Sequence, residues 1–160
     1  MHIEPDDLSR PAVAELLREH MRHMQSLSPP ESVHALDLDA LNTPNPSLWT
    51  AWDNGLLLGC GALKELSPTH GEIKSMRTSD QWRRRGTAQA ILGHIITVAR
   101  QRNYELLSLE TGSHPDFAAA RRLYKKNHFK DSEPFAGYTN DPHSVFMSLR
   151  LANSSIRGLQ

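Results

Sequence analysis

The residues best suited to bind an anion lie in one short segment, Gln81-Trp82-Arg83-Arg84-Arg85-Gly86-Thr87-Ala88. It stands between a predicted strand and a predicted long amphipathic helix. Backbone N–H groups at a helix start have no partner within the helix, and the helix dipole adds partial positive charge there. Gly86 lets a phosphate approach the backbone closely, and Arg83 and Arg85 supply charge-assisted hydrogen bonds. The segment predicts a pyrophosphate site, with a solvated basic loop that caps an ordinary helix as the alternative.

Alternating strands and helices must hold this segment in place. Hydrophobic periodicity and turn residues predict strands over residues 2–5, 48–53, 56–66, 71–78, 104–110 and 144–151, and helices over residues 11–25, 31–41, 86–102 and 116–127. Asn54-Gly55 lies between two β-prone runs and predicts a hairpin. A three-strand meander followed by helix, strand, helix and strand indicates an α/β fold whose mixed sheet is joined partly by crossover helices.

Length and charge limit the classes of protein that fit. The 160 residues suit one domain, and 18 Lys plus Arg balance 18 Asp plus Glu. A neutral chain argues against a dedicated nucleic-acid binder, which usually carries a basic surplus. The amino-terminal residues lack the basic and apolar regions of a signal peptide, and no stretch approaches a membrane span. We therefore expect a cytoplasmic protein without a nucleic-acid or membrane partner.

Cysteine and histidine usage predicts neither a thiol nucleophile nor a metal site. The single cysteine, Cys60, lies in an apolar run, which favours a buried thiol and agrees with a reducing compartment. His20 and His23 are three residues apart, whereas His94 and His114 are isolated. None of these spacings matches a zinc pattern, so we expect no bound metal.

Four segments carry a resemblance to a known family. Arg83-x-x-Gly86-x-Ala88 matches a Gln/Arg-x-x-Gly-x-Gly/Ala signature, and Ala119–Phe129 looks like an A-x-x-L-Y-x-x-x-G-F block. The Leu109–Gly112 segment and the ending Pro134–Leu149 resemble a little-characterised bacterial subgroup. Together, over roughly residues 48 to 150, the chain resembles the GNAT superfamily of N-acetyltransferases.

This resemblance implies a fold and an activity. The fold would be a central mixed, mostly antiparallel twisted sheet flanked by helices, with residues 1–152 as one acyl-CoA N-acyltransferase domain and 153–160 as a polar tail. The activity would transfer the acetyl group of acetyl-CoA to a small acceptor, expected to be a primary amine, by direct attack in a ternary complex. A non-catalytic acyl-CoA-binding or regulatory module on the same fold is the alternative. Relatives are frequently dimers, which makes a homodimer an expectation here.

The resemblance also assigns the cofactor site. Backbone N–H groups from Arg84 through Ala88 would hold the pyrophosphate, and the strand edge at residues 76–78 would pair with the pantetheine arm. The residues expected to bind acetyl-CoA are Met76, Arg77, Thr78, Arg83, Arg84, Arg85, Gly86, Thr87 and Ala88.

Two side chains are the predicted catalytic groups. Tyr124 matches the family tyrosine that protonates the leaving thiolate, with a core-packing role as the alternative. Glu72 is the expected general base for the amine, Glu110 is its rival, and His143 is a candidate for the acceptor pocket.

The chain departs from the family pattern at two places. His128 stands where relatives often have glycine. Residues around His114 to Asp116 occupy the place of an asparagine that often contacts the cofactor.

Overall fold

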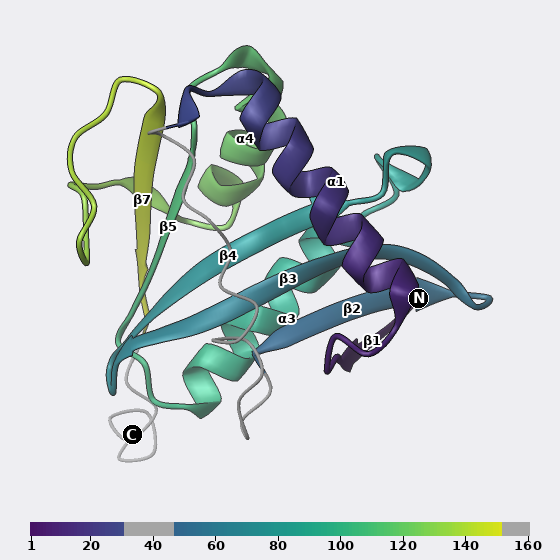
Figure 1. Cartoon of the computed structure of the whole chain (residues 1–160). Coiled ribbons are helices and arrows are strands. Elements are labelled where there is room, and N and C mark those ends of the chain that lie inside the picture. The colour runs from purple at the N-terminus through teal and green to yellow at the C-terminus, as the bar shows by residue number, and fades with distance from the viewer. Residues whose placement is uncertain (31–46, 152–160) are drawn as a thin grey trace.

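The computed structural model describes residues 1–30 and 47–151 (Figure 1). The helix predicted over residues 31–41 and the tail predicted over residues 153–160 lie outside them. The strands are β1 (His2–Pro5), β2 (Leu48–Asp53), β3 (Leu56–Ser67), β4 (His70–Thr78), β5 (Leu106–Gly112), β6 (Lys130–Asp131) and β7 (Ser144–Arg150). The helices are α1 (Pro11–Leu27), α3 (Thr87–Gln101) and α4 (Ala118–Lys126), and 3₁₀ turns cover η2 (Asp80–Trp82) and η3 (Pro115–Phe117).

The described strands form one sheet in the order β1-β2-β3-β4-β5-β7-β6. Every neighbouring pair is antiparallel except β4 and β5, which run parallel. A parallel pair needs a crossover connection, and α3 provides it. The sheet is therefore mixed and mostly antiparallel, as predicted.

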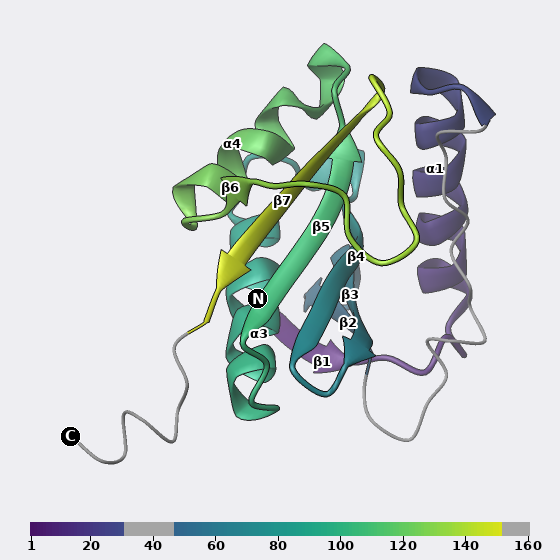
Figure 2. The same ribbon diagram turned by 90° about the vertical axis from the view of Figure 1, so that its left-hand side faces the viewer.

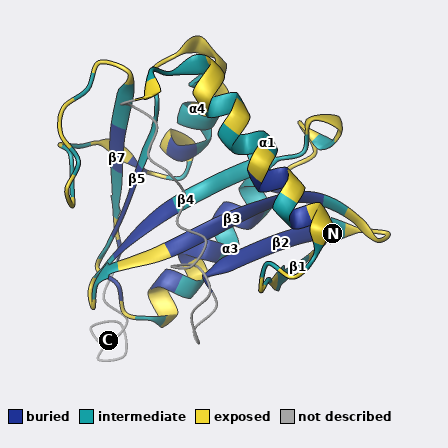
Figure 3. Cartoon of the chain, viewed as in Figure 1, coloured by how far each residue is buried: buried dark blue, intermediate teal, exposed yellow. Residues whose placement is uncertain are grey.

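Helices cover both faces of this sheet: α3 and α4 lie on one face and α1 lies on the other (Figure 2). Each face has its own apolar cluster. The larger one packs α3 through Ile91, Leu92 and Ile95 against the sheet, and the smaller one packs α1 through Val13 and Leu16. Buried residues accordingly concentrate in the central strands and the sheet-facing sides of the helices (Figure 3). None of the described helices is long and apolar enough to cross a membrane.

Element types agree with the sequence-based prediction, while some boundaries differ. The strand predicted over residues 104–110 is β5, which begins at Leu106 and continues to Gly112. The helix predicted from residue 116 begins as the 3₁₀ turn η3 and becomes α-helical only at Ala118. Pro115 is tolerated at the start of this turn, because the N–H group that it lacks would have no helical partner there. The two-residue strand β6 was not predicted.

Candidate active site

The two parallel strands at the centre of the sheet separate part-way along their length. Pairing between β4 and β5 runs from His70↔Leu106 to Ile73↔Leu109 and then stops, although β4 continues to Thr78. A bulge accompanies the separation: the β3–β4 register shifts between Cys60 and Ala62, and Ser75 has a φ of 56°. The unpaired part of β4 therefore exposes backbone groups toward a gap in the sheet.

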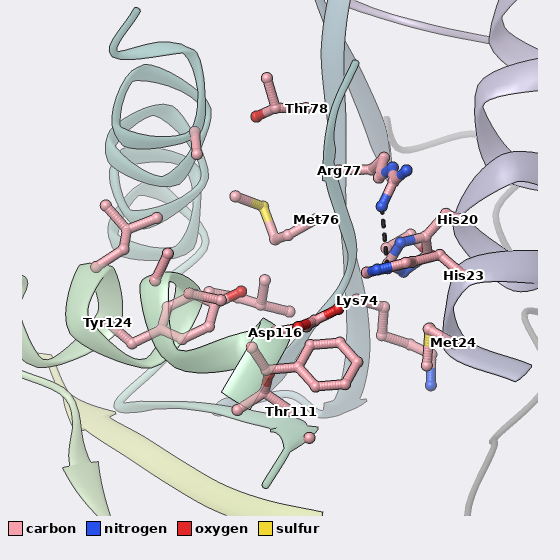
Figure 4. Close-up of a pocket in the computed structure, with 18 of the residues that line it drawn as sticks. His20, His23, Met24, Lys74, Met76, Arg77, Thr78, Thr111, Asp116 and Tyr124 are labelled. Carbon is pink, nitrogen blue, oxygen red and sulfur yellow. Dashed lines mark hydrogen bonds between the residues drawn. The ribbon is translucent and has the colours of Figure 1, made fainter. Parts of the chain in front are cut away.

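A cavity of about 560 Å³ opens at this gap. Its wall includes β4 from Glu72 to Thr78, the end of β5, the first turn of α3 and the inward side of α4. Residues of α1, including His20, His23 and Met24, close the opposite side (Figure 4). The volume is in the range of small-molecule and cofactor sites.

The Arg83–Ala88 segment forms one end of the cavity. Gly86 precedes α3 with a φ of 79°, in the left-handed region that favours glycine, and Ala90 N–H donates to its carbonyl at 3.0 Å. A Cβ on Gly86 would meet no atom within 4 Å, so there is open space beside the helix start. The hydroxyl of Thr87 is buried without a hydrogen-bond partner in the described structure. This end has the geometry of an anion site.

Tyr124 of α4 lies at the cavity and in the core. Its side chain is 6% exposed, packs edge-on against Phe129 at 5.8 Å between ring centroids, and lines the cavity. The hydroxyl makes no hydrogen bond to another described residue, and Figure 4 shows the ring pointing into the space beside Met76. Burial raises the pKa of Tyr124. The hydroxyl is therefore protonated at neutral pH and able to donate.

Two side-chain hydrogen bonds join the end of α4 to the first turn of α3. The amides of Gln89 and Asn127 exchange two hydrogen bonds, of 2.8 and 3.0 Å. His128 follows with a φ of 74°, a conformation that favours glycine at a helix end. The family's glycine position is thus occupied by a histidine in the glycine-like conformation, and the turn itself is retained.

Glu72 is held by two partners on the α1-facing side of β4. The carboxylate is buried, accepts a hydrogen bond of 2.7 Å from the Tyr138 hydroxyl, and lies 3.5 Å from Lys74 Nζ. Lys74 Nζ also donates to the Tyr138 hydroxyl at 3.1 Å. Burial and the Glu72 carboxylate raise the pKa of Tyr138. Tyr138 comes from the segment before β7, so it joins a loop to the carboxylate predicted to act as base.

Glu110, the rival base, lies at the end of β5 and also lines the cavity. Its charge acts on the same tyrosine hydroxyl, because it contributes to the raised pKa of Tyr138. Phe135, Phe146 and the Tyr138 ring contact one another with centroids 5.1 to 5.9 Å apart. The two carboxylates therefore line this end of the cavity, and the aromatic cluster is joined to it through the hydrogen bond from Tyr138 to Glu72.

The sequence and the fold both match known proteins. The family model of the acetyltransferase (GNAT) family matches residues 11–129. A Bacillus subtilis (strain 168) protein named uncharacterized N-acetyltransferase YsnE is 53% identical over 151 residues, which cover 94% of this chain and 100% of that protein. An Escherichia coli (strain K12) protein named uncharacterized N-acetyltransferase YedL is 49% identical, covering 96% of each.

The chain belongs to the GNAT family of acetyltransferases.

A solved GNAT family acetyltransferase from Elizabethkingia anophelis, with acetyl-CoA bound, has the same fold with a TM-score of 0.65. That match covers 94% of this chain and 97% of the other at 16% identity. The present chain is thus an acetyl-CoA-dependent acyltransferase by family.

The GNAT fold brings most of the predicted site residues together. The cavity lining includes Glu72, Met76, Arg77, Thr78, Arg83, Arg84, Gly86, Thr87, Ala88, Glu110, Tyr124 and His143. Arg85 is the exception, because its guanidinium stacks over Trp82 at 4.9 Å from the ring centroid. Near the family's asparagine position, Asp116 lines the cavity.

The single cysteine is a buried core residue, as its apolar surroundings predicted. The Cys60 thiol is fully buried, and burial raises its pKa to about 12. Within residues 1–30 and 47–151, no group of three or more His, Cys, Asp or Glu side chains could hold a metal ion.

Sequence reasoning named Glu72, Glu110 and His143 but missed the long-range contacts made by the charged side chains on the α1-facing side of β4. The Tyr138–Glu72 contact joins residues 66 apart, and the Arg77–His23 contact joins residues 54 apart. The only signal was the strand alternation that places Glu72 and Lys74 on one face. The N-terminal helices and the loop around residues 134–143 were expected to border an acceptor pocket, but no sequence signal identified His23 and Tyr138 as the contacting residues.

Proposed function

We propose that this protein transfers the acetyl group of acetyl-CoA to a small primary amine by direct attack in a ternary complex. The observation that carries the proposal is the separation of β4 from β5 beyond Ile73↔Leu109, which leads from the start of α3 to Tyr124. Acetyl-CoA supplies the activated acyl group, and the protein supplies orientation and proton handling. The family and the two N-acetyltransferase relatives favour this enzyme over a non-catalytic acyl-CoA-binding module.

Backbone groups bind the cofactor in this proposal. The N–H groups from Arg84 through Ala88 hold the pyrophosphate at the helix start, where the open space beside Gly86 fits a phosphate. The unpaired edge at residues 76–78 binds the pantetheine arm as an added strand. Arg83 and Arg84 line this end of the cavity and add positive charge.

Side chains handle the protons. Glu72 takes the proton of the attacking amine, directly or through water, from its place in the cavity wall. Tyr124 gives its proton to the leaving thiolate from the opposite side of β4. Glu110 is the second carboxylate within the same cavity and is the alternative base.

A calorimetric titration with acetyl-CoA tests the cofactor site, with Gly86→Glu as the blocking variant. A carboxylate placed in the open space at the helix start repels a phosphate and takes its volume. We expect acetyl-CoA to bind the natural protein and the affinity of Gly86→Glu to fall at least about 100-fold. Gly93→Glu controls for an added carboxylate on α3, because a Cβ there also meets no atom within 4 Å, and Gly86→Ala controls for the strain of a side chain at the φ of 79°.

The Gly93→Glu control should bind acetyl-CoA as the natural protein does. If Gly86→Glu and Gly93→Glu bound acetyl-CoA with equal affinity, the phosphates of acetyl-CoA would not bind at Gly86. No binding by the natural protein would overturn the proposed function.

A further inference from the structure

Arg77 carries a positive charge into the cavity wall beneath α1. Its side chain is only 9% exposed and lines the cavity. The guanidinium Nη2 donates to Asp80 at 3.2 Å, and Nη1 lies 3.2 Å from His23 Nδ1. The third guanidinium nitrogen, Nε, is buried and has no hydrogen-bond partner among the described residues.

The charge of Arg77 is incompletely balanced. Asp80 is 71% exposed and also pairs with Arg83 at 2.9 Å, so its carboxylate is shared and screened by water. His20 has a buried Nδ1 without a partner in the described structure, and burial lowers its pKa to about 4. His20 is therefore neutral at pH 7. A buried guanidinium in these surroundings is stabilised by a further anion.

Strand register places the Arg77 side chain on the side of β4 that faces α1, which is the acceptor side in the proposed function. Arg77 pairs with Cys60 and Lys74 pairs with Ala62, and both partners belong to the α1-facing cluster. Met76, between them, packs against the cluster of the opposite face. Figure 4 shows Arg77 beside His20 and His23, away from Tyr124. An anion bound by Arg77 would therefore lie on the α1-facing side of the cavity, and not at the start of α3 where the pyrophosphate is expected.

The α1-facing side of the cavity is acidic at the Glu72 end, which is the end away from Arg77. Glu72 and Glu110 line it together with one ammonium group, that of Lys74. The amine of an acceptor is attracted to such an end, while a carboxylate is attracted to Arg77. Guanidinium groups bind carboxylates through paired charge-assisted hydrogen bonds.

We propose that the acceptor is an amine that also carries a carboxylate, and that Arg77 binds the carboxylate while the Glu72 end receives the amine. This inference rests on the proposed function and narrows its substrate class. Arg77 sets specificity in this account and takes no part in the proton transfers.

Matched acceptor pairs test the proposal. Common α-amino acids and ω-amino acids of two to six carbons are each compared with their carboxamides, with free CoA release measured by a thiol reagent. We expect at least one acid to be acetylated with a kcat/KM about ten- to a hundred-fold above that of its carboxamide, the size of a charged hydrogen bond. Equal use of acid and carboxamide, or acetylation of none of the acids, would overturn the proposal.

Substitutions of Arg77 then test whether this residue causes the preference for acids over their carboxamides. Arg77→Met should lower the acid-to-carboxamide ratio at least tenfold, and Arg77→Lys should retain part of it because one charge remains. Arg22→Met is the control, since Arg22 is on α1 but is 61% exposed and pairs with Glu15. An unchanged ratio in Arg77→Met would overturn the proposal.

The same variants distinguish a carboxylate of the acceptor from a phosphate of CoA. Residue 77 is expected to meet the pantetheine arm through its backbone, which Arg77→Lys preserves, so calorimetry with acetyl-CoA should give the same affinity, within about threefold, for this variant and the natural protein. A tenfold loss with acetyl-CoA alone would assign Arg77 to the cofactor and overturn the proposal. The proposed function would stand in that case, because it depends on acetyl-CoA binding by the natural protein.

Discussion

The two sides of β4 are built from different chemical groups. On the side of α3, the predicted cofactor site consists mainly of backbone N–H groups at a helix start and an unpaired strand edge. On the side of α1, the wall consists of charged and polar side chains, among them Glu72, Lys74 and Arg77. One strand thus separates a site defined by backbone geometry from a site defined by side-chain identity.

This difference has a physical consequence for substitution. A backbone site depends on chain conformation, as at Gly86, and tolerates most changes that preserve it. A side-chain site changes its charge and hydrogen bonds with each substitution. We infer that the acetyl-CoA site is fixed by the fold, while the acceptor is chosen by a few residues on the α1 side.

Tyr124 offers the strongest test of this comparison, because it is a side chain on the backbone-built side. Tyr124→Phe removes the proton donor and keeps the ring. We expect kcat to fall about 10² to 10⁴-fold while acetyl-CoA affinity stays within about threefold. Tyr104→Phe is the control, since Tyr104 is a buried tyrosine whose hydroxyl donates to Glu65 at 2.9 Å.

The pH dependence of kcat sharpens the same test. Burial raises the pKa of Tyr124, so the hydroxyl keeps its proton through the alkaline range. The natural protein should show no loss of kcat from Tyr124 below about pH 10, its ordinary pKa. A parallel loss of kcat and of acetyl-CoA binding in Tyr124→Phe would instead favour a packing role.

Glu72 and Glu110 test the other side, with an intermediate effect. Glu72→Gln keeps an oxygen for the Tyr138 hydroxyl but removes the base. We expect kcat/KM for the amine to fall about 10² to 10³-fold, with acetyl-CoA affinity unchanged. Glu110→Gln is measured in parallel, and a larger fall there would transfer the role of base to Glu110.

His20 gives the smallest expected effect, on stability rather than on rate. Its folded pKa is about 4 against an ordinary 6.5, so the unfolded chain binds more protons between these pH values. Stability is therefore lost as pH falls from 6.5 toward 4, by up to about 3 kcal/mol from this residue. His20→Gln should flatten this slope in urea unfolding, and His143→Gln, at an exposed site, is the control that should leave it unchanged. An unaltered slope in His20→Gln would contradict the burial of this ring.

The sequence predicted the helices and strands of the backbone-built side because their signals are local. The helix start at Gly86, the strand before it and the helix that carries Tyr124 follow from spacing within a few turns of chain. Arg85 was assigned to the same site, yet its side chain stacks on Trp82, a choice that spacing does not determine.

The sequence indicated Glu72, Glu110 and the segments around the acceptor side, but the contacts that join them could not be predicted, because they are not local. Tyr138 reaches Glu72 across 66 residues, and His23 reaches Arg77 across 54. Such contacts depend on how α1 and the segment before β7 pack over the sheet, which no local pattern encodes. The separation of β4 from β5 is likewise a property of pairing and not of either strand alone.

The most direct test of the central claim is a backbone amide NMR titration of the protein with acetyl-CoA. Binding through backbone groups predicts the largest shift changes at the N–H groups of Met76–Thr78 and Arg84–Ala88. Smaller changes are expected near His70 and Phe135, on the α1-facing side. Largest changes on that side, with the Arg84–Ala88 amides unmoved, would contradict the account.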